Sequence, residues 1–258
     1  MPVVKSRMNP DRPWTLAAPS CVLPAGIAEN CAFLAQKFDE IGLAFFETEA
    51  CLAYTATDLP PGLAQLPVGW HIHLPLDLPW AEGVDRVAEA VLRLGDRAAH
   101  VAPRWFVLHP PREPGVLAEL MHKLEAGGLP PAQVLVENIA GRDLARHWPV
   151  IEAAGLGVCL DLGHMLVHGQ QEFLDLPGLA ARTRMVHLNA PDPHKPSRHA
   201  SLSVLDRAGR ALCRRLLDTL APGGVVMLEL FSEDALFDSL RVLDALSASE
   251  AGKMEARA

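Results

Sequence analysis

Histidine, aspartate and glutamate residues recur at the ends of short apolar segments of this 258-residue chain. The sixth of these segments reads Leu156-Gly-Val-Cys-Leu-Asp161-Leu-Gly-His164, so a β-prone run ends on a carboxylate and, three residues later, an imidazole. A buried strand would bring both side chains to one space above a parallel sheet. Oxygen and nitrogen donors of this kind bind divalent metals such as Zn²⁺ and Mn²⁺. The spacing alone also arises by chance in capped turns, so its weight comes from recurrence.

The same kind of ending occurs on several other apolar segments. The candidate metal ligands are His73, His109, Glu137, Asp161, His164, His187, His199 and Glu229. A single histidine at a strand end is more often a hydrogen-bonded core residue than a ligand. Glu137 and Glu229 are harder to explain in that way, because burying an unpaired carboxylate is expensive. We therefore expect the set to hold divalent metal.

Other polar and aromatic residues are expected to have structural or surface roles. His71 shares a face with His73 but lies one layer deeper, which indicates a core histidine. Cys159 is expected to alternate away from the face of Asp161 and to pack, and the adjacent Phe45 and Phe46 are expected to pack between barrel and helices. Five further histidines are expected on helix surfaces or in solvated loops: His100, His122, His147, His168 and His194.

The elements that must position the candidate ligands alternate between apolar runs and segments of helical period. Strands are predicted at residues 14–21, 43–47, 68–76, 105–108, 133–136, 156–161, 184–188 and 225–230. Helices are predicted at residues 27–41, with a stop at Gly42, and at 84–99, 114–126, 143–153, 204–220 and 236–246. Eight such units in about 250 residues predict a single (β/α)8 TIM barrel, whose active site lies at the C-terminal ends of the strands. A doubly wound open sheet is the alternative, but the chain has no Gly-x-Gly-x-x-Gly and no P-loop, which also speaks against nucleotide cofactors.

Composition sets further bounds. Residues 1–246 are expected to form one domain, and residues 247–258 a flexible tail. The formal charge of −8, from 31 acidic and 23 basic residues, argues against general nucleic-acid binding. Five widely spaced cysteines without a Cys-x-x-Cys motif indicate reduced thiols, and neither a signal peptide nor a membrane-spanning run is found. We expect a cytoplasmic protein with no membrane partner.

The motifs in combination resemble the xylose-isomerase-like and apurinic-endonuclease superfamily of TIM barrels. Its marks are His73-Leu-Pro, His109-Pro, Val136-Glu137-Asn138, Asp161-Leu-Gly-His164, His187 and Leu228-Glu229. Within it, a fuller pattern looks like the cobamide-remodelling phosphodiesterases, which detach the lower-ligand riboside from the nucleotide loop of a corrinoid. That pattern adds Phe46-Glu47, His73-Leu-Pro-Leu-Asp77, Cys159-Leu-Asp161, His199-Ala-Ser-Leu202 and Leu228-Glu229-Leu-Phe231.

The resemblance implies two chemistries that share four residues. Glu137, Asp161, His187 and Glu229 match the metal ligands of both the sugar isomerases and the endonuclease branch. His73, His109 and His199 match additional ligands of the multi-metal phosphodiesterases and favour hydrolysis, whereas His164 is common to both branches.

One position departs from the endonuclease pattern. That branch has an aspartate two residues before its equivalent of His199, and this chain has Ser197, so a third metal would need Asp192 to fold back. Between one and three ions per chain are expected, with one or two favoured.

The leading hypothesis is metal-dependent hydrolysis of a corrinoid phosphodiester, with Glu137 and Glu229 as the catalytic carboxylates. Lys195 and Arg198 are candidate phosphate-binding residues, and Glu47 is a candidate substrate contact. The alternative is a sugar or sugar-phosphate isomerase or epimerase that uses one divalent metal, in which His73 and His109 would bind substrate. A third possibility is a non-catalytic metal- or corrinoid-binding protein.

Overall fold

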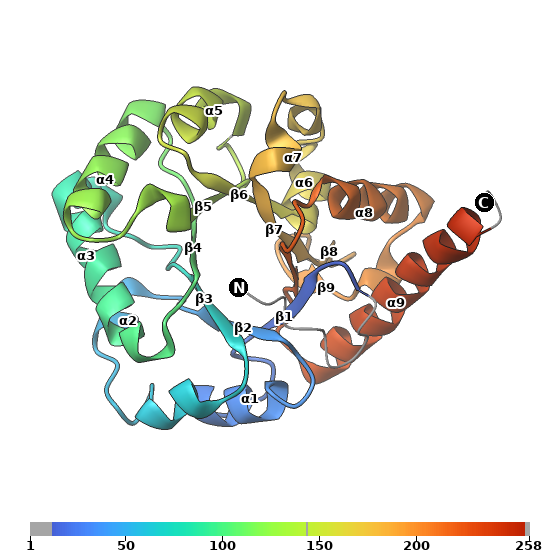
Figure 1. The fold of residues 1–258 in the computed structure, drawn as a ribbon, viewed down its shortest axis with the longest axis horizontal. Coiled ribbons are helices and arrows are strands. Elements are labelled where there is room, and N and C mark those ends of the chain that lie inside the picture. Colours follow the sequence, from blue (N-terminus) through green and yellow to red (C-terminus); the bar gives the residue numbers. More distant parts are fainter. Residues whose placement is uncertain (1–11, 143, 256–258) are drawn as a thin grey trace.

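Eight parallel strands form a closed barrel, which confirms the predicted single (β/α)8 TIM barrel. The computed structural model describes residues 12–142 and 144–255, with side chains as far as residue 247. The order around the barrel is β1-β10-β7-β6-β5-β4-β3-β2. Figure 1 looks along the barrel and shows the helices as an outer ring, with α9 extending away from it. None of the described helices is long and apolar enough to cross a lipid bilayer.

The barrel strands are short. They are β1 (Thr15–Pro19), β2 (Glu40–Ala44), β3 (Gly69–His73), β4 (Trp105–Leu108), β5 (Val134–Glu137), β6 (Gly157–Asp161), β7 (Thr183–Leu188) and β10 (Val225–Leu228). The α-helices are α1 (Ile27–Leu34), α2 (Thr48–Leu52), α3 (Val84–Arg97), α4 (Pro114–Ala126), α5 (Leu144–Ala153), α6 (Leu162–His168), α7 (Leu179–Arg182), α8 (Arg207–Thr219) and α9 (Glu233–Glu255). An antiparallel pair, β8 (Ala190–Pro191) and β9 (His199–Ala200), follows β7.

Two apolar layers explain why these segments form strands. A large cluster fills the space between the strands and the helices, and a small one fills the barrel interior. The interior cluster consists of Ala17, Val107, Leu135, Cys159, Met185, Val225 and Met227. Both faces of each strand are therefore covered, which is why β5 and β6 read as continuous buried runs rather than as alternating ones.

The first helix and the second strand differ from the prediction. The predicted helix at residues 27–41 ends at Leu34, and Ile41 and Gly42 belong to β2, so Gly42 does not stop a helix. Phe38 and Ile41 are fully buried, as the helical period required, but they pack from a loop and a strand. An apolar period therefore predicted burial correctly and secondary structure wrongly at this junction.

The end of the chain also differs. The last helix, α9, begins at Glu233 and continues to Glu255, beyond the predicted end at residue 246. The predicted flexibility of the tail is not tested and stays an expectation. Residue 143, the first residue of a predicted helix, lies outside the described residues, and α5 begins at Leu144.

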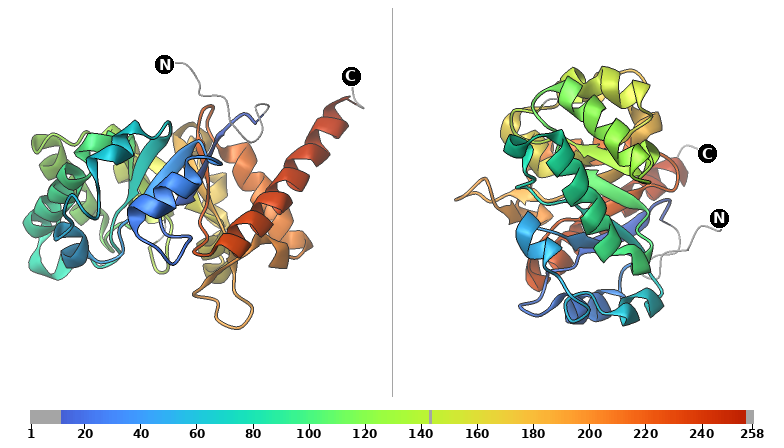
Figure 2. Two further views of the ribbon diagram at one scale, coloured as in Figure 1. Left: turned by 90° about the horizontal axis from the view of Figure 1, so that it is seen from below. Right: turned by 90° about the vertical axis from the view of Figure 1, so that its left-hand side faces the viewer.

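The hairpin of β8 and β9 marks the functional end of the barrel. In the left view of Figure 2 it projects as an orange loop at the lower edge, while the C-terminal part of α9 points to the opposite side. Its strands lie directly beyond the end of β7, so the hairpin rises from the C-terminal ends of the barrel strands.

Candidate metal centre

The candidate ligands come together at the C-terminal ends of six barrel strands. His73, Glu137 and Asp161 are the last residues of β3, β5 and β6, and His109 and Glu229 directly follow β4 and β10. His187 is the penultimate residue of β7 and pairs in register with Asp161. Parallel strands bring such ends to one edge of the barrel, which is why residues far apart in sequence converge.

Glu137 lies at the centre of this site and is fully buried. Its Oε2 atom faces two imidazoles, at 3.1 Å from His73 Nε2 and 3.0 Å from His109 Nε2. Its Oε1 atom faces a third, at 3.2 Å from His187 Nδ1. One carboxylate therefore presents its two oxygens to two groups of ligands.

The two groups are compact enough for metal binding. One consists of His73, His109 and Glu137, and the other of Glu137, Asp161, His187 and Glu229; within each, the donor atoms lie within 4.8 Å of one another. Glu137 belongs to both groups. The four residues shared by the two predicted chemistries form one group, and the additional histidines of β3 and β4 belong to the other. The two groups overlap, because His73 also forms a compact group with His187 and Glu229, and its Nε2 atom lies 3.7 Å from Glu229 Oε1.

His109 supplies a further sign that a cation fits here. Its Nε2 atom is buried and near Glu137 Oε2, yet the geometry is not that of a hydrogen bond, and the atom has no hydrogen-bond partner among the described residues. A buried polar atom without a partner is costly. A cation bound by His109 Nε2 and Glu137 Oε2 would make both atoms ligands.

Backbone carbonyls fix the orientation of three imidazoles. The Nδ1 atoms of His73, His164 and His199 lie 3.0, 2.8 and 3.0 Å from the carbonyl oxygens of Leu74, Asn138 and Glu229. A carbonyl oxygen only accepts hydrogen bonds, so each Nδ1 must carry the proton and donate it. The Nε2 atom of each ring then keeps its lone pair and can bind a metal. Metal-binding histidines commonly have this arrangement. His187 is oriented the other way, with Nδ1 towards the carboxylates.

The pKa shifts in the site show that its buried carboxylates favour positive charge nearby. Burial raises the pKa of Glu137, but the charges of His187 and His109 outweigh it and hold that pKa well below its usual range. Burial would lower the pKa of His73, whereas its hydrogen bond to Glu137 and the charges of Glu137 and Glu229 raise it. In His164, the charges of Asp161 and Glu137 likewise overcome burial and raise the pKa to about 9.

Most of the other pKa shifts agree with this interpretation, but at His109 burial outweighs the charge of Glu137 and lowers the pKa. Burial acts against both charged forms, yet Cys159, Glu229 and Glu137 raise the pKa of His187 well above its usual value. His187 and His199 lower the pKa of Glu229. Asp161 keeps a raised pKa because burial dominates. Protons on His73, His164 and His187 thus balance buried carboxylates, a role that a divalent cation can take. The residues present therefore fit a divalent metal.

Two asparagines that sequence reasoning did not assign a role hold Asp161 in place. Asn189 donates to Asp161 Oδ2 at 2.7 Å and lies 3.5 Å from Glu229 Oε2. Asn138 accepts from the Asp161 backbone nitrogen at 2.8 Å and donates to its carbonyl oxygen. The signal for Asn138 was its position directly after Glu137, but nothing in the local sequence marked Asn189.

His164 and His199 lie at the rim rather than in either compact group. Their ring centroids are 6.1 Å apart, and His164 Nδ1 lies 3.8 Å from Asp161 Oδ1. Asp192 does not fold back towards them, because its Oδ1 atom accepts hydrogen bonds from the backbone of His194 and Lys195 in its own hairpin. Their role as ligands of a third ion stays a prediction.

A cavity of about 610 Å³ opens above the ligands. His73, His109, Glu137, His164, His199 and Glu229 line its floor and sides, Arg198 and Ser197 line it from the hairpin, and Phe46, Leu76, Met227 and Phe231 supply apolar surface. Of the three predicted substrate contacts, Arg198 alone lines the cavity. Lys195 is exposed on the hairpin, and Glu47 is exposed at the N-cap of α2, so neither is brought to the cavity.

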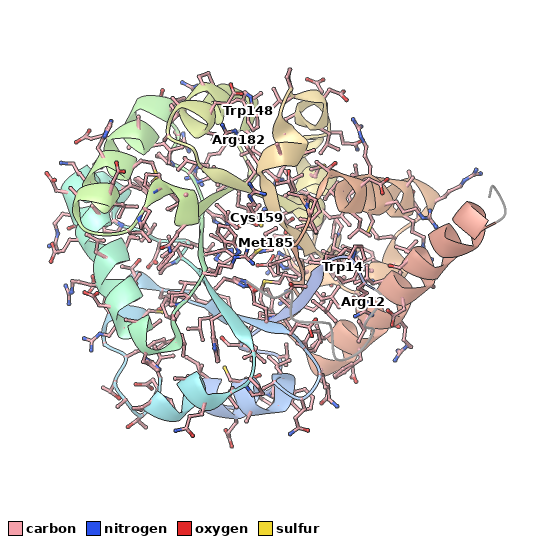
Figure 3. The ribbon with its side chains drawn as sticks, viewed as in Figure 1. Arg12, Trp14, Trp148, Cys159, Arg182 and Met185 are labelled. Atoms are coloured by element: carbon pink, nitrogen blue, oxygen red, sulfur yellow. The ribbon has the colours of Figure 1, made fainter. Side chains whose placement is uncertain are left out.

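Three expectations about single residues are wrong. His147 is fully buried rather than on the surface, and its Nε2 contacts the Pro111 carbonyl oxygen at 2.8 Å. Cys159 does pack, but on the same interior face as Asp161, since strand residues two apart share a side; Figure 3 shows it beside Met185 in the middle of the barrel. Phe46 is 47% exposed and lines the cavity.

His71 matches its prediction as a core histidine. It is fully buried, and its Nδ1 lies 2.7 Å from Glu40 Oε1. His71 therefore belongs to the layer beneath the metal centre and not to the centre itself.

Fold and site together define a TIM barrel with a candidate centre for divalent metal at the C-terminal ends of its strands. Comparison with solved structures confirms the TIM-barrel fold, and the chain is similar in fold to xylose-isomerase-like proteins. A D-tagatose 3-epimerase-like protein matches with a TM-score of 0.72 and 15% identity over 93% of this chain and 99% of its own. A xylose isomerase domain-containing protein from Salmonella typhimurium matches with a TM-score of 0.62 and 15% identity over 92% and 97%.

A third solved structure holds a metal. The IolI protein, crystallised with a zinc atom, matches with a TM-score of 0.68 and 12% identity over 91% of this chain and 98% of its own. A scan of protein-family models finds no match to the sequence, and neither does a search of curated proteins. Identities this low establish the fold alone.

Proposed function

We propose that the chain is a divalent-metal-dependent phosphodiesterase that hydrolyses the nucleotide loop of a corrinoid and releases the lower-ligand riboside. The observation that carries this proposal is the two-sided environment of Glu137. Its oxygens face one group containing His73 and His109 and another containing His187. A shared carboxylate between two ligand groups is the arrangement expected for a two-metal hydrolase, whose ions lie about 3.5–4 Å apart.

The residues that would hold metal are those of the two groups, with His164 and His199 as further candidates. Divalent ions there would supply positive charge against phosphoryl oxygens and make water more acidic. The chain itself contributes Arg198, which lines the cavity and whose guanidinium can donate two parallel hydrogen bonds to a phosphate. Asn189 and Asn138 hold Asp161 in one orientation, so the centre is largely preorganised.

The test is incubation of the Mn²⁺- or Zn²⁺-loaded protein with a panel of complete cobamides, followed by mass analysis of the products. Release of an α-riboside is expected, and Glu137→Gln should abolish it. Absence of any riboside with the metal-loaded protein, together with epimerisation of ketose sugars, would show that the assignment is wrong.

A sugar epimerase or isomerase is the second candidate, and the structural comparisons favour it more than they favour hydrolysis. Under it, Asp161 and His187 would hold one metal together with Glu137 and Glu229, and those two glutamates would exchange a proton with the sugar. His73 and His109 would then contact substrate.

Metal content separates the two candidates. Elemental analysis of the purified protein should give two ions per chain for the phosphodiesterase, and His73→Ala should lower the count to one. A single ion that His73→Ala leaves in place would favour the epimerase. An intact metal content without turnover of either substrate class would indicate the third possibility, a metal- or corrinoid-binding protein.

A further inference from the structure

The mouth of the cavity has an apolar wall that metal chemistry does not explain. Among the described residues, five large apolar side chains are exposed, and three of them line this one cavity: Phe46 at 47%, Leu76 at 60% and Phe231 at 43%. Exposing apolar surface to water is unfavourable, and its concentration at one site commonly marks a ligand contact.

The two aromatic rings of this wall are held in a defined arrangement. Phe46 and Phe231 meet edge to face, with ring centroids 5.7 Å apart. On its other side Phe231 stacks on His199, at 5.1 Å and an interplanar angle of 22°. His199 is in turn fixed by the carbonyl oxygen of Glu229. The wall is thus joined directly to the residues around the metal centre.

Arg198 completes the arrangement with a positive charge. It lines the same cavity from the hairpin, one residue before His199, and its backbone closes the hairpin. Its side chain forms no hydrogen bond or ion pair with the described residues, although its charge lowers the pKa of Asp192 in the same hairpin. A ligand that occupies the whole site would have an anionic group near Arg198 and the metal ligands and a flat apolar group against the wall. A cavity of about 610 Å³ is larger than a monosaccharide needs and is in the range typical of drug-sized ligands.

We infer that Phe46, Leu76 and Phe231 form a subsite for a heteroaromatic ring attached close to the phosphate of the substrate. The inference rests on the proposed function, because it names the part of a phosphodiester that the cavity selects. Stacking fits the two exposed phenylalanines, since bases bind proteins by stacking on aromatic side chains, and binding weakens when such a side chain is removed.

The experiment compares two probes, phenyl phosphate and ethyl phosphate, by calorimetric titration of the Mn²⁺-loaded protein. Phenyl phosphate is expected to bind about tenfold more tightly, because one stacked ring contributes roughly 1.4 kcal/mol. Phe46→Leu should remove most of that preference while keeping apolar bulk and leaving His199 untouched. Phe231→Leu should do the same, with an added effect through His199.

The matched control is Phe33→Leu, since Phe33 lies on α1, stacks edge to face on Phe237 and does not line the cavity. It should keep the full preference for phenyl phosphate. Equal affinity for the two probes, failure of both to bind, or an unchanged preference in Phe46→Leu would overturn the inference.

The two proposals can fail separately. A preference for phenyl phosphate that depends on Phe46, in a protein that releases no riboside from cobamides, would leave the subsite in place and reject the proposed reaction. Riboside release by a protein that binds both probes equally would do the reverse.

Discussion

Asn189 donates a hydrogen bond to Asp161 Oδ2 over 2.7 Å, and its side-chain oxygen occupies the space in which a Cβ atom on residue 163 would lie. Gly163, in the first turn of α6, is thus required by the asparagine that orients a metal ligand. The glycine of the Asp-Leu-Gly-His motif is therefore explained by packing against Asn189. No local sequence pattern relates Gly163 to Asn189.

Gly163→Ala should therefore weaken metal binding. The added methyl group displaces Asn189, which loosens Asp161, and loss of such a supporting contact typically lowers metal affinity about 10- to 100-fold. Calorimetric titration with Mn²⁺ measures the change. Gly115→Ala is the matched control, because a Cβ there meets nothing within 4 Å.

A double variant tests the cause of that effect. In an Asn189→Ala background the overlap no longer exists, so Gly163→Ala should have little further effect, and the two changes should be strongly non-additive. Independent, additive losses of affinity would show that Gly163 acts in another way.

Removal of metal should destabilise the protein. Glu137, Asp161 and Glu229 bring three carboxylates into a buried site, and a bound cation stabilises the folded state by about 2.7 kcal/mol at a free concentration one hundred times its Kd. Thermal unfolding with Mn²⁺ and with excess chelator measures the difference.

Glu137→Gln should remove most of this metal-dependent gain, since both ligand groups contain Glu137. Glu47→Gln, at an exposed position outside the cavity, should keep it. An equal response of the two variants to metal would contradict the central role of Glu137.

The site was more predictable than the packing around it. Residues at the ends of apolar runs must meet at one edge of a parallel barrel, so His73, Glu137, Asp161 and Glu229 followed from strand order alone. Which oxygen of Glu137 faces which imidazole depends on distances across the barrel. The local sequence carries no record of those distances, and for the same reason it did not reveal Asn189 or the exposure of Phe46.

The boundary between α1 and β2 shows the same limit in the fold. Phe38 and Ile41 continue the helical period of Cys31 and Leu34, and all four are fully buried. The apolar period shows which residues face the apolar layer. A loop followed by a strand can bury the same residues as a helix does. Tertiary contacts with β1 and β3 decide the outcome.

The cysteine thiols should react slowly in the native protein. Burial raises the pKa of Cys21, which is partly exposed, to about 12, and the nearby charge of Glu229 adds to the effect. A raised pKa favours the neutral thiol, and the thiolate is the reactive form, so alkylation near pH 8 should be much slower than for an ordinary thiol of pKa about 8.5. The native rate should keep rising with pH up to about 12.

Labelling with iodoacetamide, followed by mass analysis of native and urea-unfolded samples, measures this difference. All five cysteines should react readily once the chain is unfolded, because the raised pKa values come from burial. Rapid labelling of native Cys21 at pH 8 would contradict the explanation.

Gly42→Ala should destabilise the barrel beneath the metal centre. A Cβ on Gly42 would overlap His71 Nε2 and come within 3.1 Å of the Met227 methyl group. His71 cannot move without losing its contact with Glu40 Oε1, at 2.7 Å, and all three side chains are buried, so no solvent-filled space can absorb the change. Overpacking of this kind lowers the free energy of unfolding by about 1–3 kcal/mol, which unfolding in urea measures.

Gly62→Ala is the control. A Cβ there meets nothing within 4 Å, so its free energy of unfolding should stay within about 0.5 kcal/mol of wild type. Equal stability of the two variants would mean that His71 can reorient freely. A loss of stability confined to Gly42→Ala would show that glycine is needed at this position of β2 to leave room for His71 on β3.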